Sequence, residues 1–333
     1  MSHANISVFV PHSGCPNRCS FCDQVSISGT GKQPKAKDVD QAVKLAMSST
    51  RYNPENTELA FFGGSFTAIN REYMLELLSA AFVHVKNKNI CGIRISTRPD
   101  CIDAEVLDIL KKHGVTAIEL GAQSMCDEVL TENNRGHTAE AVRNASRLIK
   151  ASGFELGLQM MTGLYKSDYC RDVYTANEIV KLAPDTVRIY PAITLKNTML
   201  EALYFDGEYM PPSLDETIDL CVELIEMFNK HGIKVIRTGL HSIDNKNYIA
   251  GPWHPAFREL CDSRVYLNKL CSMLTEKGDY TIFAAPKEIS KVIGNKKYNL
   301  NKLKSLGYKC TVVADESVAV SDIRVERMNN SCF

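Results

Sequence analysis

The chain has 333 residues, which is enough for one large α/β barrel and a small additional module. It carries 39 basic and 39 acidic side chains, and this zero formal charge excludes an overall field that attracts polyanions. Contact with nucleic acid would therefore need a local basic patch. No apolar run is long enough to cross a membrane, and the N-terminus lacks the basic region and cleavage signature of a secretory signal. We expect a cytoplasmic protein.

Short β-branched runs alternate with amphipathic segments of helical length, a pattern typical of repeated βα units around a parallel sheet. We predict strands at residues 6–10, 58–62, 92–97, 117–121, 155–160 and 186–190. We predict helices at residues 38–47, 71–85, 104–113, 138–151, 172–182 and 214–231. The run KVIRTGL is a candidate for one further strand. This order predicts an α/β fold with a partial, TIM-like (β/α)6 barrel over residues 1–245 and a small C-terminal α/β module over residues 246–333.

The loop after the first predicted strand contains three cysteines, Cys15, Cys19 and Cys22, in the run HSGCPNRCSFCDQ. Three thiolates at this Cys-x3-Cys-x2-Cys spacing can hold three irons of a 4Fe-4S cluster and leave the fourth iron open for chemistry. Zinc is the alternative, with His12 as a fourth ligand, but the second Cys or His pair of a structural zinc site is missing. The remaining cysteines lack a regular spacing and are expected to be reduced thiols.

A glycine run, GGSFT at residues 63–67, directly follows the second predicted strand. Two glycines let the backbone approach a ligand closely, and amides and carbonyls at a strand end can bind a zwitterionic amino acid. Taken alone, the run would be better explained by a tight turn between a strand and a helix. The glycine run, however, follows the second predicted strand and the cysteine loop follows the first. In a barrel, the loops after the strands carry the site, so both motifs are expected there.

Further motifs follow the other predicted strands in the order STRPD, IELGAQS, NRGHT and QMMTGL. With the cysteine loop, FFGGSFT and the stretch RIYPAITLKNTMLEALYFDGEYMPPS, they resemble the radical S-adenosylmethionine (SAM) domain of the Elongator catalytic subunit, a tRNA-modifying enzyme, and its shorter bacterial relatives. The resemblance runs over residues 6–215. It implies a radical SAM barrel, a 4Fe-4S cluster whose open iron binds SAM, and reductive cleavage of SAM to a 5'-deoxyadenosyl radical.

The resemblance also implies roles for single residues. Gly63, Gly64 and Ser65 would receive the amino group of SAM. Glu119 and Gln123, at the end of the fourth predicted strand, would bind its amino or ribose groups. Without the motifs, Glu119 would be interpreted as a carboxylate that pairs with a nearby Lys or Arg.

Arg135 matches the arginine that pairs with the SAM carboxylate in oxygen-independent coproporphyrinogen oxidases. Two positions depart from the relatives, because Ser96 stands where they often carry Glu, and Gln159 stands where they carry Asp or His. An amide can still hydrogen-bond a ribose hydroxyl, so Gln159 remains a predicted SAM contact. Tyr190 and Lys196, beyond the sixth predicted strand, are candidates for substrate contact, although a Tyr at a strand end is more often a packing residue.

The run KEISKVIGNKKYNLNKLKSLGYKCTVV predicts two helices joined at residues 294–297, followed by a strand. It weakly resembles a KH nucleic-acid module, whose Gly-x-x-Gly loop lets phosphates approach the backbone, but Lys297 replaces the second glycine. Residues 286–310 contain seven Lys and one Glu, a charge that attracts phosphate. Lys296 and Lys297 are therefore candidate RNA contacts, and a solvated lysine-rich helix pair is an equally good interpretation.

Together these patterns predict a radical SAM enzyme that acts on RNA, with tRNA as the favoured substrate and a low-potential protein such as ferredoxin or flavodoxin as electron donor. Two alternatives stay open: radical chemistry on a small metabolite or peptide, and an iron–sulfur RNA-binding or regulatory protein that does not cleave SAM. The acetyltransferase domain of Elongator would not fit in the roughly one hundred residues after His231, so its carboxymethylation chemistry is not expected here.

Overall fold

Within the residues that the computed structural model describes, 4–11, 18–23, 32–240, 243 and 245–328, seven parallel strands form one sheet in the order β1-β2-β3-β4-β5-β6-β8. The strands are β1 (Ala4–Val10), β2 (Thr57–Gly63), β3 (Gly92–Thr97), β4 (Val115–Gln123), β5 (Glu155–Thr162), β6 (Thr186–Pro191) and β8 (Lys234–Thr238). All six predicted strands are present, and KVIRTGL supplies the additional one. The predicted partial barrel is confirmed.

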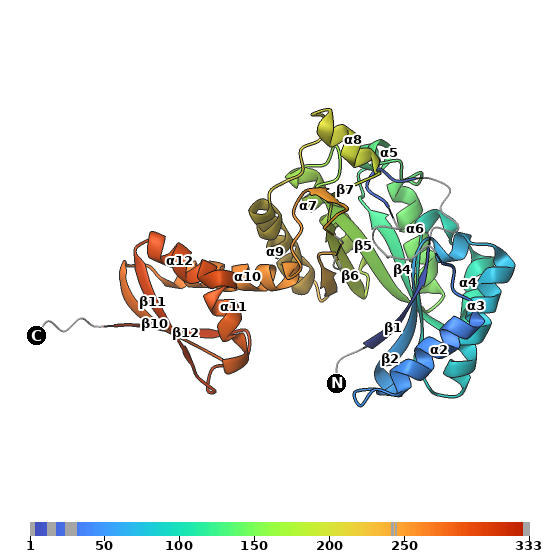
Figure 1. The fold of residues 1–333 in the computed structure, drawn as a ribbon, viewed down its shortest axis with the longest axis horizontal. Coiled ribbons are helices and arrows are strands. Elements are labelled where there is room, and N and C mark those ends of the chain that lie inside the picture. Colours follow the sequence, from blue (N-terminus) through green and yellow to red (C-terminus); the bar gives the residue numbers. More distant parts are fainter. Residues whose placement is uncertain (1–3, 12–17, 24–31, 241–242, 244, 329–333) are drawn as a thin grey trace, which may run out of the picture. The chain divides into compact units, whose positions relative to one another are not determined.

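Helices connect the strands and lie along the sheet (Figure 1). They are α2 (Ala36–Met47), α3 (Arg71–Lys86), α4 (Ala104–Lys112), α5 (Asp127–Glu132), α6 (Ala139–Ala151), α7 (Tyr169–Leu182), α8 (Met199–Phe205) and α9 (Leu214–Lys230). In α6, Thr138 caps the first turn by accepting the amide of Ala141, and Val142, Ala145 and Ile149 form the buried face. None of the helices in the described part of the chain has both the length and the apolar character that a membrane crossing requires.

The chain divides into two compact units. The barrel unit comprises residues 1–213 and 226–253 and also holds a small ribbon of β7 (Thr194–Leu195) and β9 (Tyr248–Ala250). The C-terminal unit comprises residues 214–225 and 254–333. The predicted domain boundary at residues 245 and 246 stays a prediction, and the chain passes from one compact unit to the other at residues 213/214, 225/226 and 253/254.

The C-terminal unit contains a three-stranded sheet in the order β11-β10-β12 within its described residues. Besides the first part of α9, its elements are α10 (Phe257–Met273), β10 (Gly278–Ala284), α11 (Ile289–Ile293), α12 (Tyr298–Ser305), β11 (Tyr308–Ala314) and β12 (Ile323–Arg327). Leu270, Ile282, Val292 and Leu303 pack in one buried cluster that joins the helices to the sheet. The predicted pair of helices around residues 294–297 is present, and the KH resemblance stays a prediction.

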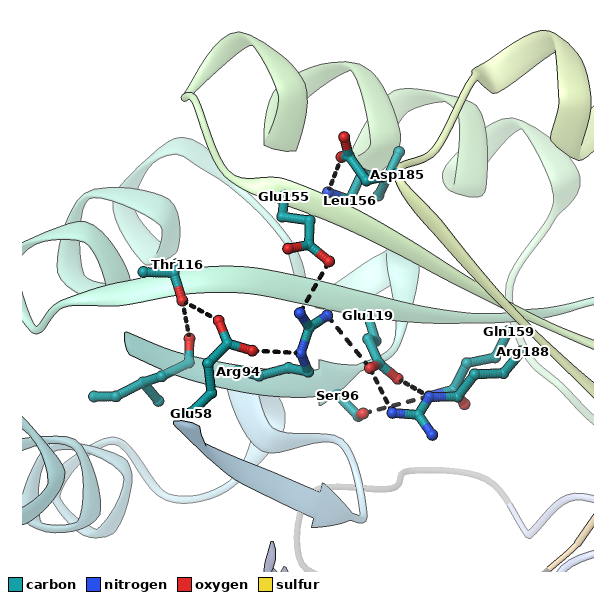
Figure 2. A network of polar contacts seen from close by, with 11 residues as sticks. Glu58, Arg94, Ser96, Thr116, Glu119, Glu155, Leu156, Gln159, Asp185 and Arg188 are labelled. Carbon is teal, nitrogen blue, oxygen red and sulfur yellow. Dashed lines mark hydrogen bonds and ion pairs between the residues drawn. The ribbon is translucent and has the colours of Figure 1, made fainter. Parts of the chain in front are cut away.

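A network of buried ion pairs crosses the barrel sheet from β2 to β6 (Figure 2). Arg94 on β3 donates to Glu58 and Glu155 at 2.9 Å each, and its Nη1 lies 3.5 Å from Glu119. Arg188 on β6 donates to both oxygens of Glu119, at 2.7 and 2.9 Å. The side chains of Arg94 and Glu119 are only 4% and 1% exposed. Because water is excluded, each charge depends on its partners, and the pairs fix neighbouring strands relative to one another.

We expect Arg94→Met to lower the free energy of unfolding by about 3–5 kcal/mol, because it removes a buried cation that contacts three carboxylates. Urea unfolding followed by circular dichroism measures the change. Lys112→Met is the control, since Lys112 pairs with Asp108 on the surface and such a pair contributes about 1 kcal/mol or less. Equal losses in the two variants would contradict the importance of the network.

Candidate functional site

A cavity of about 130 Å³ lies where the loops after the first strands of the sheet converge. The carboxyl ends of parallel strands meet at one edge of a barrel sheet, which explains why these loops share a cavity. The lining residues are Arg18, Cys19, Phe21, Cys22, Gly63, Gly64, Ser65, Ser96, Thr97, Arg98, Gly121, Gln123, Arg135 and Gln159. Most of the predicted cluster and SAM residues thus lie around one cavity. Cys15 lies outside the described residues.

The described part of the cysteine loop is anchored by Asn133, which is fully buried. Its backbone carbonyl accepts the amide of Ser20 at 3.1 Å, and its side-chain Oδ1 accepts the Ser20 hydroxyl at 2.5 Å. The Asn133 amide nitrogen donates to the carbonyls of Val129 and Tyr165 at 2.7 and 2.9 Å. These contacts hold Cys19, which is 8% exposed, and the partly exposed Cys22 at the cavity wall. The sequence analysis missed Asn133, because nothing in the local pattern links it to a loop more than one hundred residues earlier.

Gly63 lets the end of β2 turn into the cavity. Its φ of +117° lies in the region that favours glycine, and a Cβ there would lie 2.6 Å from the carbonyl oxygen of Val10. The next amide, of Gly64, donates to the same carbonyl at 2.9 Å. The Ser65 hydroxyl contacts Thr97 Oγ1 at 2.8 Å and accepts the amide of Arg98 at 3.1 Å. Ser65 therefore ties the glycine run to the loop after β3.

Gln123 ends β4 in an unusual conformation. The pairing of β4 with β5 shifts between Gly121 and Gln123, and Gln123 has a φ of +65°, which is uncommon for a residue with a side chain. Its Oε1 is buried and accepts no hydrogen bond from the described residues. A strained residue whose buried acceptor lacks a hydrogen bond costs free energy. A ligand that donates a hydrogen bond to this oxygen would offset that cost.

Arg135 is buried at the cavity rather than exposed on the surface. Its guanidinium donates to the carbonyl of Gly121 at 2.6 Å, to Cys19 Sγ at 3.3 Å and to His137 Nε2 at 3.3 Å. Arg98, to which the sequence analysis gave no role, donates to the carbonyl of Arg135 at 2.6 Å. Its guanidinium also donates to both carboxylate oxygens of Asp100, at 2.9 and 3.0 Å. The Arg-Pro-Asp run at the end of a strand could have indicated this role.

Glu119 does not line the cavity but contacts a residue that does (Figure 2). Gln159 lines the cavity and donates to the Glu119 carboxylate at 2.9 Å and to Ser96 Oγ at 3.3 Å. Arg188 also donates to both carboxylate oxygens of Glu119, so each oxygen already accepts a hydrogen bond from within the protein. Its assignment to SAM stays a prediction, and the contacts in the structure give it the role of orienting Gln159.

The four predicted substrate contacts do not line this cavity. Tyr190 packs beside an apolar cluster that includes Val129 and Met161, and burial raises the pKa of its phenol. Lys196 is exposed. Lys296 and Lys297 belong to the C-terminal unit. All four assignments stay predictions.

The cavity residues fit the cofactors that the sequence implies. Soft cysteine sulfurs suit iron, and the guanidinium of Arg135 next to Cys19 suits the negative charge of a thiolate or of a carboxylate. The Gln123 oxygen, which has no hydrogen-bond donor in the described part of the chain, suits an amino or hydroxyl donor. The described residues contain no group of three side chains that could hold a metal ion, and Cys15 is not among them.

We expect stability to fall on acidification through His137. Burial, together with the Arg135 charge, lowers the pKa of His137 to about 4, so the folded ring stays neutral where an unfolded histidine is already protonated. The unfolded state then binds more protons, and the free energy of unfolding should drop by about 2 kcal/mol between pH 7 and pH 5 through this group. Urea unfolding at both pH values measures the drop, which His137→Gln should reduce by that amount. An unchanged drop in the variant would contradict a neutral His137.

Comparisons with known proteins show which proteins the chain is related to. The model of the radical SAM superfamily matches residues 9–174, and the model of the radical SAM C-terminal domain matches residues 184–267. Elongator complex protein 3 of Dictyostelium discoideum is 29% identical over 210 residues, which cover 57% of this chain and 36% of that protein. The tRNA uridine(34) acetyltransferase of Methanocaldococcus jannaschii is 28% identical over 263 residues, covering 65% of this chain and 47% of that protein.

Among solved structures, the archaeal Elp3 of Methanocaldococcus infernus, with an N-terminal deletion, has the same fold, with a TM-score of 0.66 and 22% identity. The match covers 81% of this chain and 64% of the other. The chain spans less than half the length of the two curated relatives, 36% and 47%. These matches confirm the resemblance that the motifs predict.

Proposed function

Because the chain belongs to the radical SAM superfamily, we propose that it is an enzyme that holds a 4Fe-4S cluster on Cys15, Cys19 and Cys22 and cleaves SAM to act on RNA, with tRNA as the substrate. One observation carries the proposal: two of the cysteines, the glycine run and the Gln123 oxygen, which accepts no hydrogen bond from the described residues, surround one cavity. The cysteines alone would also suit an iron–sulfur cluster that does not cleave SAM. Such a cluster would not require the polar residues that line the cavity beside the cysteines.

Different residues of the cavity suit different polar groups of SAM. The guanidinium of Arg135 suits the carboxylate, because it can donate two parallel hydrogen bonds. The backbone of Gly63 and Gly64 offers close contact to the amino group, and the amides of Gln123 and Gln159 suit the ribose hydroxyls. When bound, the cluster supplies the electron that breaks a carbon–sulfur bond of SAM and yields the 5'-deoxyadenosyl radical. The protein holds SAM, excludes water and positions the target.

The RNA substrate is supported by two separate observations. One relative is named a tRNA uridine(34) acetyltransferase, and others are named Elongator complex protein 3. In addition, residues 286–310 carry seven Lys and one Glu although the whole chain has no net charge. We infer that the reaction takes place in the cytoplasm with a low-potential electron donor such as ferredoxin or flavodoxin. Chemistry on a small metabolite or peptide would leave the lysine-rich segment without a use.

We expect the protein, reconstituted anaerobically with iron and sulfide and then reduced, to convert SAM into 5'-deoxyadenosine, and to do so faster with tRNA. Chromatography of the products measures the reaction. Cys19→Ala should abolish it, because the cluster loses a ligand. A bound cluster that forms no 5'-deoxyadenosine and whose electron paramagnetic resonance does not respond to SAM would favour the RNA-binding or regulatory alternative. Acceleration by a metabolite and not by tRNA would contradict the RNA substrate.

We expect Gln123→Ala to weaken SAM binding about tenfold, because the loss of a hydrogen bond between polar groups in a buried site costs about 1–2 kcal/mol. Equilibrium dialysis of labelled SAM against the reconstituted protein measures the dissociation constant. Gln41→Ala, which removes an exposed amide on α2, is the matched control and should leave the constant unchanged. An equal effect of both substitutions would argue against a SAM contact at Gln123.

A further inference from the structure

A second and larger cavity, of about 450 Å³, lies entirely within the C-terminal unit. Its wall is formed by the start of α9, by α10 and by the turn and helix that follow α11. The volume falls in the range of roughly 300–1,000 Å³ that is typical of small-molecule sites. None of the residues of the barrel cavity contributes to it. The function proposed for the barrel cavity therefore leaves this second cavity unexplained.

The charged side chains of this wall favour an anion. The wall contains three cationic side chains, those of Arg264, Lys296 and Lys302, and one carboxylate, that of Asp215. Arg264 already donates to Asp215 at 2.7 Å, and the Tyr298 hydroxyl lies 3.5 Å from the same oxygen. Lys296 and Lys302 are exposed and make no ion pair with any described residue. Two ammonium charges are thus left for a ligand, and phosphate is the anion that such groups commonly bind.

The backbone around the lysines is held in an uncommon conformation. Lys296 and Lys297 have φ values of +49° and +62°, and Gly294 has a φ of +81°. A Cβ at Gly294 would lie 2.9 Å from the amide nitrogen of Asn299, so this turn packs directly against the first turn of α12. No side chain caps the start of α12. The positive end of the helix therefore lies beside the lysines and adds to the attraction for an anion.

Asn299 and Tyr298 offer a hydrogen-bond acceptor and an aromatic ring, two groups that can bind a nucleotide base. Asn299 is 1% exposed, its amide nitrogen donates to backbone carbonyls of α10 and α11, and its Oδ1 accepts no hydrogen bond from the described residues. The Tyr298 ring is 42% exposed, with the Arg264 guanidinium 5.4 Å from its centroid. Exposed aromatic rings beside cations are the usual platforms for unpaired RNA bases.

We infer that this cavity binds one nucleotide of an RNA strand, with its phosphate against Lys296 and Lys302 and its base against Tyr298. RNA is favoured over a free nucleotide because exposed lysines continue beyond the cavity at Lys297 and Lys304, where neighbouring phosphates of a strand would lie. The inference deepens the proposed RNA substrate and rests on it. It assigns recognition of the substrate to the C-terminal unit and the radical chemistry to the barrel unit.

The test measures binding of fluorescently labelled tRNA to the full chain by anisotropy, without SAM, over a range of salt concentrations. The double variant Lys296→Glu and Lys302→Glu should weaken binding at least tenfold and lower the slope of log K against log salt by between about 1 and 2. Lys309→Glu makes the same kind of substitution at a single lysine on β11, outside the cavity, with half the charge change of the double variant, and should alter affinity less than about threefold.

Tyr298→Ala and Tyr298→Phe separate stacking from charge. The alanine variant should bind tRNA about tenfold more weakly with an unchanged salt slope, because a stacked base is lost but no cation is. The phenylalanine variant keeps the ring and should bind like the unaltered protein. A weakening by Phe as large as that by Ala would overturn stacking on this ring.

The deoxyadenosine assay on the unaltered protein separates this inference from the proposed function. If tRNA accelerates deoxyadenosine formation but the lysine double variant binds tRNA normally, the cavity is not the RNA site and the proposed function stands. If the unaltered protein forms deoxyadenosine but neither binds nor responds to tRNA, both the RNA substrate and this inference are wrong. If AMP binds in a Lys296-dependent manner and tRNA does not, the cavity takes a free nucleotide and the inference is overturned.

Discussion

One buried carboxylate, Glu119, constrains the strands that carry the barrel site (Figure 2). It is 1% exposed, receives two hydrogen bonds from Arg188 and lies 3.5 Å from Arg94. A buried carboxylate without its cations would cost several kcal/mol, so β3, β4 and β6 must keep the register that brings these charges together. Gln159 donates to the same carboxylate and lines the cavity. The charges in the sheet thereby set the position of a polar group in the site.

The cavity itself is built from arrangements that are unfavourable without a ligand. Gly63 turns with a φ of +117°, Gln123 sits at a bulge with a φ of +65°, and the Gln123 oxygen has no donor among the described residues. Arg135 is buried with its guanidinium against a cysteine sulfur and a backbone carbonyl. Such features persist where the surrounding structure holds them in place, and here the buried ion pairs link the strands of the sheet. The same reasoning applies to the turn before α12 in the C-terminal unit.

The parts of the fold that the sequence predicts are those with strong local patterns. The apolar runs of the seven strands and the long amphipathic helices in the described chain show their period over many residues, and the motifs at the strand ends name most of the cavity wall. The short helices α5 and α8, with six and seven residues, are too short to show a period. Contacts between distant residues, such as Glu119 with Arg188, leave no local signal. This is why the sequence does not reveal the contacts of Glu119 with Arg188, nor the roles of Asn133 and Arg98.

The central proposal is that SAM would bind in the cavity beside the cysteines, at the open iron of the cluster that they would hold. Electron–nuclear double resonance of the reduced, reconstituted protein tests this directly when SAM carries 15N in its amino group. The proposal predicts a 15N hyperfine coupling to the cluster, and the 15N signal should be replaced by a 14N signal when unlabelled SAM is used. A reduced 4Fe-4S signal that shows no coupling to the labelled nitrogen at saturating SAM would contradict it.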